Sequence, residues 1–250
     1  MIDEPLTPAS YAASLILMRD RRSGPPELLI VQRSAALAFA AGAFAFPGGR
    51  IDAVDGLLAA RLAPELDADD GAARIAAVRE TIEETGIAVA LSPHPDPATI
   101  AAWRAGGMAG LAERADIRFD PAALTPFARW LPNERIVRRF DTRFYLAEAL
   151  DDWTPDADGT ETNHAFWMTA EAVLDRCARQ DGRALFPTRR LLERVARFAT
   201  IADARDEALR LPHRIISPWI DQRPDGRYLC VPDDAGYPVS EERIETAMRS

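Results

Sequence analysis

The strongest indication of the fold is a glutamate-rich segment, Arg79-Glu80-Thr81-Ile82-Glu83-Glu84-Thr85-Gly86-Ile87, which lies downstream of Phe46-Pro47-Gly48-Gly49. A helix turns by about 100° per residue, so a helix here carries Glu80, Glu83 and Glu84 on one stripe. The opposite side collects aliphatic side chains, those of Ile75, Val78 and Ile82. One helix therefore buries an apolar ridge and presents three carboxylates on its other face.

Like charges at these spacings repel one another, at a cost of about a few tenths of a kcal/mol per pair. A cation should compensate, and Mg²⁺ or Mn²⁺ is the expected cofactor because both ions prefer oxygen ligands. Neighbouring glutamates are more often a solvated helix face, but the surroundings of these favour a metal site. Arg79 can pair with Glu83, four residues later, and hold its rotamer. Gly86 ends the helix as a C-cap glycine does, and Pro47-Gly48-Gly49 supplies backbone that can approach a metal closely.

These residues resemble the box of the Nudix hydrolases, G-x5-E-x7-R-E-U-x-E-E-x-G-U, in which U is aliphatic. Gly49 opens the box, and Asp55 stands where the family has the glutamate that braces the loop. The 23 residues from 56 to 78 then replace the usual seven, so the insertion is expected to move Asp55 away from Arg79. From Arg79 onward the match holds, with Thr81 at one aliphatic position. The resemblance implies an α/β/α sandwich with a mixed sheet, whereas periodicity alone supports only a mixed α/β class.

The resemblance also implies a reaction and a set of roles. Nudix enzymes hydrolyse a diphosphate linked to another moiety, X, with the help of divalent cations that neutralise charge and acidify water. Glu80 and Glu84 would be the main metal ligands, with Glu83 and the carbonyl group of Gly49 as further ligands. Arg79 would orient the glutamates without touching the substrate.

The resemblance implies that the general base is either a box glutamate or a carboxylate from a distant loop. Glu161 is the candidate, because it precedes a predicted strand and its loop could carry it towards the metals. A surface-exposed glutamate is the alternative, weighed equally. His164 could assist, although a histidine beside a strand is usually structural.

Upstream of the box, the sequence resembles the coenzyme A signature of certain Nudix hydrolases, L-L-T-x-R-S-x3-R-x3-G-x3-F-P-G-G. Arg33-Ser34, Gly42 and Phe46-Pro47-Gly48-Gly49 stand in register with it. Val31 replaces the threonine, and Ala38 replaces the second arginine. The signature implies coenzyme A or an acyl-coenzyme A as the small-molecule diphosphate substrate.

The box insertion, residues 125–130 and 138–144, and the tail stretch 225–230 resemble the peroxisomal branch of the coenzyme A diphosphatases. The products in that branch are 3′-phosphoadenosine 5′-phosphate and (acyl-)phosphopantetheine. The candidate substrate-binding residues are Arg33, Ser34, Arg138, Arg139 and Arg143. An arginine cluster that pairs with acidic residues in solvent is the alternative. Trp130 or Trp167 could stack on a base, with a core role as the alternative.

Two other functions stay open at this point. One keeps the hydrolase and changes the substrate to ADP-ribose, a dinucleotide or a nucleotide sugar; no stretch resembles the S-Q-P-W-P-F-P signature of the NADH-cleaving group. The other is a Nudix module that senses a ligand without catalysis. Modules of that kind tend to lose box glutamates, and this chain keeps all three.

Composition bounds the remaining classes. The chain has 250 residues, 48% of them hydrophobic and 28% charged, as in soluble globular proteins. A net charge of −9 disfavours binding to nucleic acid. All 30 basic residues are arginines, so lysine chemistry is excluded and arginine is left for anion recognition. Neither a signal peptide nor a membrane-spanning stretch is recognisable, so we expect a cytoplasmic enzyme without a membrane partner.

The pattern along the chain predicts one domain over residues 1–250. It has a core at about 10–180, a helical insertion at about 92–128, and a C-terminal helical extension and tail at about 181–250. Strands are expected at 12–18, 28–32, 43–46, 88–91, 129–131, 141–146 and 165–168. Helices are expected at about 72–85 with Asp70 as N-cap, and at 98–114, 170–179 and 188–211; residues 55–70 are expected to be irregular. The apolar face of 188–211 would cover the sheet or form a homodimer.

Overall fold

The computed structural model describes residues 8–36, 40–114, 116–132, 139–150, 153–212 and 214–247. Within them, eight strands form one mixed sheet. At its centre, β1 (Ser10–Arg19) pairs in parallel with β8 (Phe140–Glu148) along nearly its whole length. The other side of β1 forks, because β4 (Gly48–Arg50) pairs with its first half and β2 (Glu27–Arg33) with its end. The sheet is completed by β3 (Phe44–Ala45) and β9 (Thr162–Thr169) on β2, by β7 (Thr125–Trp130) on β8, and by β10 (Ile215–Ile216) on β7.

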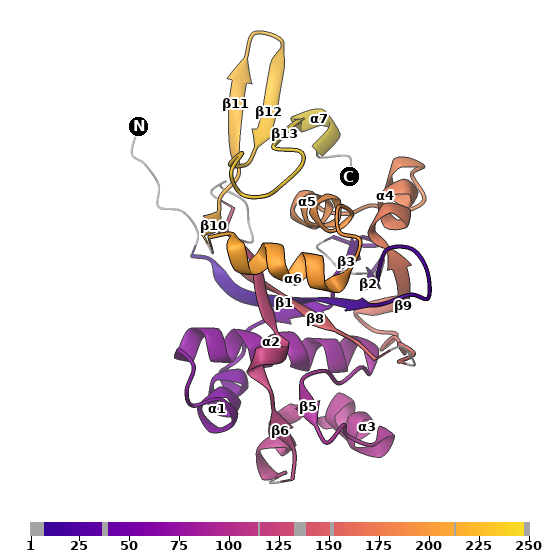
Figure 1. Cartoon of the computed structure of the whole chain (residues 1–250), viewed down its shortest axis with the longest axis vertical. Coiled ribbons are helices and arrows are strands. Elements are labelled where there is room, and N and C mark those ends of the chain that lie inside the picture. Colours follow the sequence, from indigo (N-terminus) through magenta and orange to yellow (C-terminus); the bar gives the residue numbers. More distant parts are fainter. Residues whose placement is uncertain are drawn as a thin grey trace.

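The side chains of β1 alternate between two hydrophobic cores. Leu15 and Leu17 belong to one core, and Ile16 and Met18 belong to the other. Successive strand residues point to opposite faces, so a strand buried throughout needs a layer on each side. One layer holds α1 (Ala53–Leu62), α2 (Ala68–Thr85) and α3 (Pro97–Gly106); the other holds α4 (Ala170–Ala178), α5 (Phe186–Val195) and α6 (Ile201–Arg210) (Figure 1). The predicted α/β/α sandwich is confirmed.

The helix with the glutamates, α2, begins one turn earlier than predicted. Asp67 is its N-cap, and the carboxylate of Asp67 accepts hydrogen bonds from the backbone N–H groups of Asp69 and Asp70. The prediction of Asp70 as the cap was therefore wrong, because a side-chain acceptor three residues earlier already satisfies these N–H groups. The helix ends at Gly86, whose φ of 70° is left-handed and favours glycine, as predicted from the sequence.

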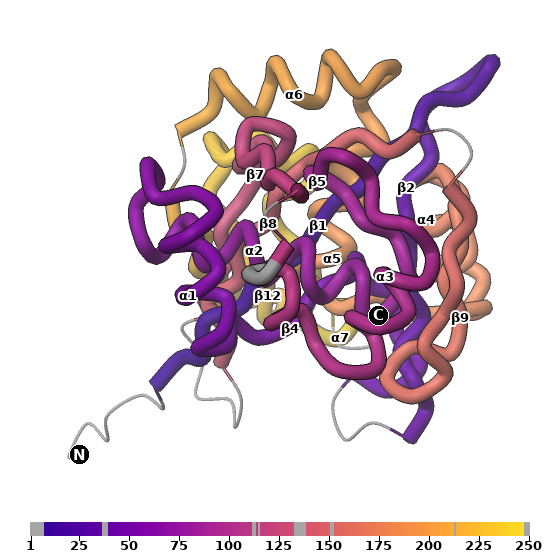
Figure 2. Tube along the Cα trace, turned by 90° about the horizontal axis from the view of Figure 1, so that it is seen from below, coloured from indigo at the N-terminus to yellow at the C-terminus, as the bar shows by residue number. Residues whose placement is uncertain are grey.

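The box insertion is helical and not irregular. It contains most of α1, which packs against α2 (Figure 2). Leu58 and Ala59 of α1 are buried in the core beneath the sheet, next to Gly71 of α2. A short apolar face thus suffices to form a helix when a larger helix covers it.

Two expected helices are interrupted. The helix expected over 98–114 stops at Gly106, and a 3₁₀ helix (Met108–Glu113) follows Gly107, whose φ is 79°. The helix expected over 188–211 is split into α5 and α6, because Thr200 and Asp203 form a capping box that starts a new helix. Leu191 is fully buried in the core, so the apolar face of α5 covers the sheet.

The strand expected over 88–91 is shorter and lies outside the main sheet. It is β5 (Leu91–Ser92), which pairs with β6 (Arg118–Phe119), and a second 3₁₀ helix (Pro121–Ala123) follows. The predicted tail forms a small sheet of β11 (Trp219–Arg223), β12 (Gly226–Cys230) and β13 (Glu241–Arg243), then α7 (Ile244–Ala247). Residues 218–247, called the C-terminal extension from here on, lie beyond α5 and α6, at the top of Figure 1. In the described part of the chain, no helix is long and apolar enough to cross a membrane.

Candidate functional site

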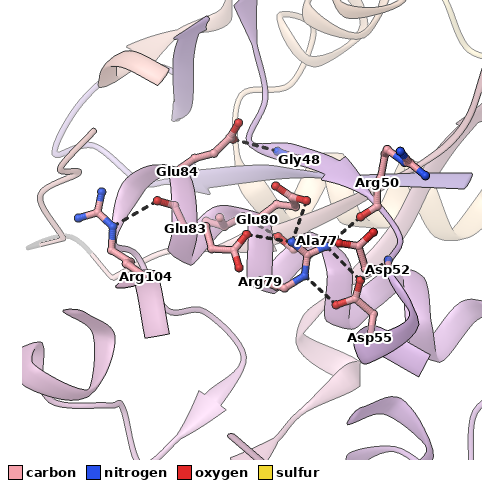
Figure 3. A network of polar contacts seen from close by, with 11 residues as sticks. Gly48, Arg50, Asp52, Asp55, Ala77, Arg79, Glu80, Glu83, Glu84 and Arg104 are labelled. Atoms are coloured by element: carbon pink, nitrogen blue, oxygen red, sulfur yellow. Dashed lines mark hydrogen bonds and ion pairs between the residues drawn. The ribbon is translucent and has the colours of Figure 1, made fainter. Parts of the chain in front are cut away.

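Arg79 lies at the centre of a network of carboxylates (Figure 3). Its Nη1 donates to Glu80 Oε1 and to Glu83 Oε2, at 2.9 Å in each case. Its Nη2 donates to the backbone oxygen of Arg50 at 2.8 Å. Burial would lower the pKa of Arg79, but its hydrogen bond with Asp55 and the negative charges of the carboxylates raise it. Arg79 therefore stays charged and fixes the rotamers of two of the three glutamates.

Asp55 contacts Arg79 directly, despite the 23 residues between them. The Asp55 carboxylate accepts from Arg79 Nε at 2.8 Å and from Nη2 at 3.0 Å, and Asp55 is fully buried. Its Oδ2 also accepts from the Asp52 N–H at 2.8 Å, which closes the N-terminus of α1. The expectation that the insertion moves Asp55 away from Arg79 is wrong, because α1 and α2 fold back on each other as an antiparallel pair. Asp55 meets Arg79 near one end of this pair, and Ala59 meets Gly71 further along it.

Glu84 and Glu80 are carboxylates in a poorly hydrated place. Glu84 is 5% exposed, and its Oε2 accepts one hydrogen bond, from the Gly48 N–H at 3.1 Å. Burial, with the charge of Glu80, raises the pKa of Glu84 to about 8. Burial also raises the pKa of Glu80 to about 7, although Arg79 opposes the shift. Two carboxylates that resist ionisation in the metal-free protein are suited to a cation that replaces their protons.

Gly48 and Gly49 of β4 allow the backbone to approach the carboxylates of Glu80 and Glu84. A Cβ atom on Gly49 would collide with the carboxylate of Glu80, and one on Gly48 would lie 2.5 Å from the backbone oxygen of Ala13. The backbone here is fixed by the Pro47 carbonyl, which accepts from the Ser14 hydroxyl at 2.9 Å. Gly48 therefore needs to be glycine because backbone atoms surround it, whereas a side chain at Gly49 would displace the Glu80 carboxylate.

The glutamates open into a cleft with a volume of about 1430 Å³. Arg33 lines this cleft and lies close enough to Glu84 for its charge to lower the pKa of that carboxyl, against the larger effect of burial. Arg33 Nε is buried and, among the described residues, has no hydrogen-bond partner. A buried donor without a partner is rare in native proteins, so Arg33 is suited to an anionic ligand in the cleft.

The loop before β9 forms another wall of the cleft. Glu161 lines the cleft and is exposed, and its backbone oxygen accepts from the Ser34 N–H at 2.8 Å. Asp158 holds the turn, because its carboxylate accepts from the N–H groups of Glu161 and Thr162 at 3.2 Å and 2.8 Å. Partial burial opposes ionisation, but these bonds and one from the Thr160 hydroxyl lower the pKa of Asp158.

Arg104 of α3 ties this loop to the helix that carries the glutamates. It donates to the backbone oxygen of Glu83 at 3.2 Å, and to the carboxylate and backbone oxygens of Asp156 at 2.7 Å and 2.9 Å. The sequence analysis missed both Arg104 and Asp158. The Asp158-Gly159 pair is a turn signal that could have been noticed. No local pattern marks Arg104, whose partners are distant in the sequence.

The other predicted substrate residues lie elsewhere. Ser34 is buried, and Arg139 donates from Nε to the Pro132 oxygen at 2.9 Å. Arg143 pairs with Asp70 at 3.3 Å, near the start of α2. Of the described residues that line the cleft, none is Ser34, Arg139 or Arg143, so their assignment to substrate binding is not supported by the geometry. Arg138 lies outside the described residues.

The two tryptophans proposed for base stacking have separate positions. Trp167 donates from Nε1 to the Trp153 oxygen at 2.9 Å and lies over the sheet, with the guanidinium of Arg19 4.6 Å from its ring. Trp130 is 1% exposed and donates from Nε1 to the Tyr237 hydroxyl at 2.8 Å. Trp130 also lines the cleft. Trp130 is therefore mainly a core residue.

Comparison with known proteins supplies independent findings. A family model described as NUDIX domain matches residues 9–104, which include the whole stretch from Gly49 to Ile87. The structure is similar to that of a NUDIX hydrolase from Alicyclobacillus acidocaldarius, with 29% sequence identity, a TM-score of 0.72, and coverage of 81% of this chain and 97% of that chain. It is also similar to the NUDIX domain of Shewanella oneidensis NrtR complexed with ADP ribose, at 14% identity and a TM-score of 0.45, covering 75% and 86% of the two chains.

Proposed function

We propose that the chain is a pyrophosphatase of Nudix type, because its residues 9–104 match a NUDIX domain model, and that it hydrolyses the diphosphate of coenzyme A or an acyl-coenzyme A. The products would be 3′-phosphoadenosine 5′-phosphate and (acyl-)phosphopantetheine. The observation that carries the proposal is the cleft in which the glutamates of α2 and the unpartnered Nε of Arg33 come together.

The proposed metal ligands are the carboxylates of Glu80, Glu83 and Glu84 and the carbonyl group of Gly49. This donor set consists of oxygen atoms, which fits Mg²⁺ or Mn²⁺. Within the described ranges, no three acidic, histidine or cysteine side chains already converge on one point. The raised pKa values of Glu80 and Glu84 nevertheless fit residues that exchange protons for a cation. A bound divalent cation would neutralise the diphosphate and acidify the attacking water.

Other side chains would position the metal ligands and accept a proton. Arg79 holds Glu80 and Glu83 in place, and Asp55 holds Arg79. Glu161, at the rim of the cleft, would accept the proton of the attacking water. Its loop is fixed by Asp158, so its backbone is positioned while its exposed side chain can turn towards the substrate.

Arg33 supports the coenzyme A substrate. It belongs to the Arg33-Ser34 pair of the signature, and Ser34 fixes the loop that carries Glu161 through its N–H. A guanidinium with a free buried N–H group can bind a phosphate oxygen at little further desolvation cost. ADP-ribose, a dinucleotide or a nucleotide sugar also carries a diphosphate and is the alternative substrate. A ligand-sensing module is less favoured, because the glutamates and their bracing arginine are all in place.

A substrate panel tests this proposal. Coenzyme A, an acyl-coenzyme A, ADP-ribose, NADH and a nucleotide sugar are compared by kcat/KM with Mg²⁺ present, for the wild-type protein and for Arg33→Gln. We expect the coenzyme A compounds to be preferred and Arg33→Gln to lower their kcat/KM by about ten- to a hundred-fold, the loss of one charge-assisted hydrogen bond. Arg179→Gln is the matched control, because Arg179 forms an exposed pair with Asp175 and neither residue is among those that line the cleft. Equal or better activity on the other compounds would reject coenzyme A as the substrate.

A further inference from the structure

The cleft extends well beyond the glutamates. Its volume of about 1430 Å³ exceeds the roughly 300–1000 Å³ of typical small-molecule pockets. Ser14 of β1 and Phe144 of β8 lie side by side in the sheet register and both line the cleft. Phe144 belongs to the core on the face of the sheet that α5 and α6 cover, opposite to α2. The cleft therefore continues from the glutamates to the other face of the sheet.

The far part of the cleft is an apolar chamber. We define it by six lining residues, Trp130, Phe144, Phe186, Pro218, Leu229 and Ala247. None of these six side chains is charged, and their one polar atom, Trp130 Nε1, is already bound to the Tyr237 hydroxyl at 2.8 Å. Thr142, the register partner of Trp130, also lines the cleft, so its hydroxyl is a polar group beside these six residues. The chamber is suited to a group made of carbon and hydrogen.

The C-terminal extension supplies one wall of the apolar chamber. Pro218, Leu229 and Ala247 all belong to it and lie outside the Nudix domain at residues 9–104. An ion-pair network attaches the extension to α5, because Glu242 pairs with Arg189 at 2.9 Å and with Arg190 at 3.2 Å. The wall is thus held against the domain by buried and half-buried charges.

We propose that the apolar chamber binds an aliphatic chain carried by the X group of the diphosphate, and that the C-terminal extension determines the preference for that chain. This inference rests on the proposed function for the identity of the diphosphate. Each methylene group buried from water contributes about a four-fold gain in affinity. Two or more buried methylene groups would therefore raise affinity by about ten-fold or more over the same diphosphate without the chain.

Metal-free calorimetry tests the chamber separately from catalysis. Titrations of coenzyme A, butanoyl-coenzyme A and octanoyl-coenzyme A are carried out in EDTA, so that the outcome does not depend on turnover. We expect Kd to fall with chain length in the wild-type protein. Ala247→Trp, which fills the chamber, should remove at least ten-fold of the gain from coenzyme A to octanoyl-coenzyme A. Ala202→Trp places the same bulk on an exposed position of α6 and should keep the gain.

The outcomes distinguish the inference from the proposed function. The proposed binding in the chamber is overturned if the Kd of Ala247→Trp still falls with chain length as in the wild-type protein. It is also overturned if the wild-type Kd is the same for all three compounds. Absence of binding of octanoyl-coenzyme A overturns it as well. Binding that depends on chain length together with absence of Mg²⁺-dependent cleavage supports the chamber and rejects the proposed hydrolysis.

Discussion

Replacing Asp55 with alanine should both destabilise the protein and disorganise the glutamates. The change removes two hydrogen bonds to Arg79 and the one that closes the start of α1. Breaking a buried ion pair from one side costs about 3–5 kcal/mol, because the remaining charge stays buried. Arg79 keeps Glu80, Glu83 and the Arg50 oxygen as partners, so we expect the lower end, about 3 kcal/mol.

In a chain of this size, each kcal/mol lowers the melting temperature by about 2–4 °C, so the melting temperature should fall by about 6–12 °C. The loss of the brace should also lower kcat about ten- to a hundred-fold, as losses behind metal ligands do. Thermal unfolding followed by circular dichroism, and Mg²⁺-dependent hydrolysis, measure the two effects.

Two further variants make the test specific. Asp175→Ala removes the same type of partner from an exposed pair with Arg179, and should change the stability by about 0.5 kcal/mol at most. The double variant Asp55→Ala/Arg79→Met should lose less stability than the sum of the losses of the two single variants, because the Asp55–Arg79 pair is lost only once. A melting temperature of Asp55→Ala equal to that of Asp175→Ala, or losses that add fully in the double variant, would contradict this account.

Two predictions concern protons. The pKa values of Glu80 and Glu84, about 7 and 8, lie above the usual 4.5. Between pH 4.5 and pH 8 the metal-free folded state therefore binds more protons than the unfolded chain, and its stability falls as the pH rises through this range. Mg²⁺ must displace these protons, so its stabilising effect in thermal melts should grow from about pH 6 to about pH 9; a constant effect contradicts the assignment. Glu161→Gln should lower kcat by about 10²–10⁴-fold at saturating Mg²⁺, and an unchanged kcat excludes Glu161 as the base.

The parts of the site that depend on local spacing could be predicted from the sequence. The stripe of Glu80, Glu83 and Glu84, the pair of Arg79 with Glu83 four residues later, and the stop at Gly86 all follow from helix geometry. In a helix, residues three or four apart are neighbours whatever the rest of the chain does. Apolar periodicity indicated a mixed α/β class, and the α/β/α layers were expected from the resemblance to the Nudix box.

Tertiary structure decided everything that depends on contacts between distant residues. Asp55 reaches Arg79 because α1 folds back on α2, which sequence separation does not reveal. Arg33 and Arg143 were both candidates for substrate binding from the sequence, yet Arg33 lines the cleft and Arg143 pairs with Asp70. The wall of the apolar chamber that contains Leu229 likewise depends on the attachment of the C-terminal extension to α5. Such contacts depend on which surfaces pack together over the whole chain, and no local pattern encodes that outcome.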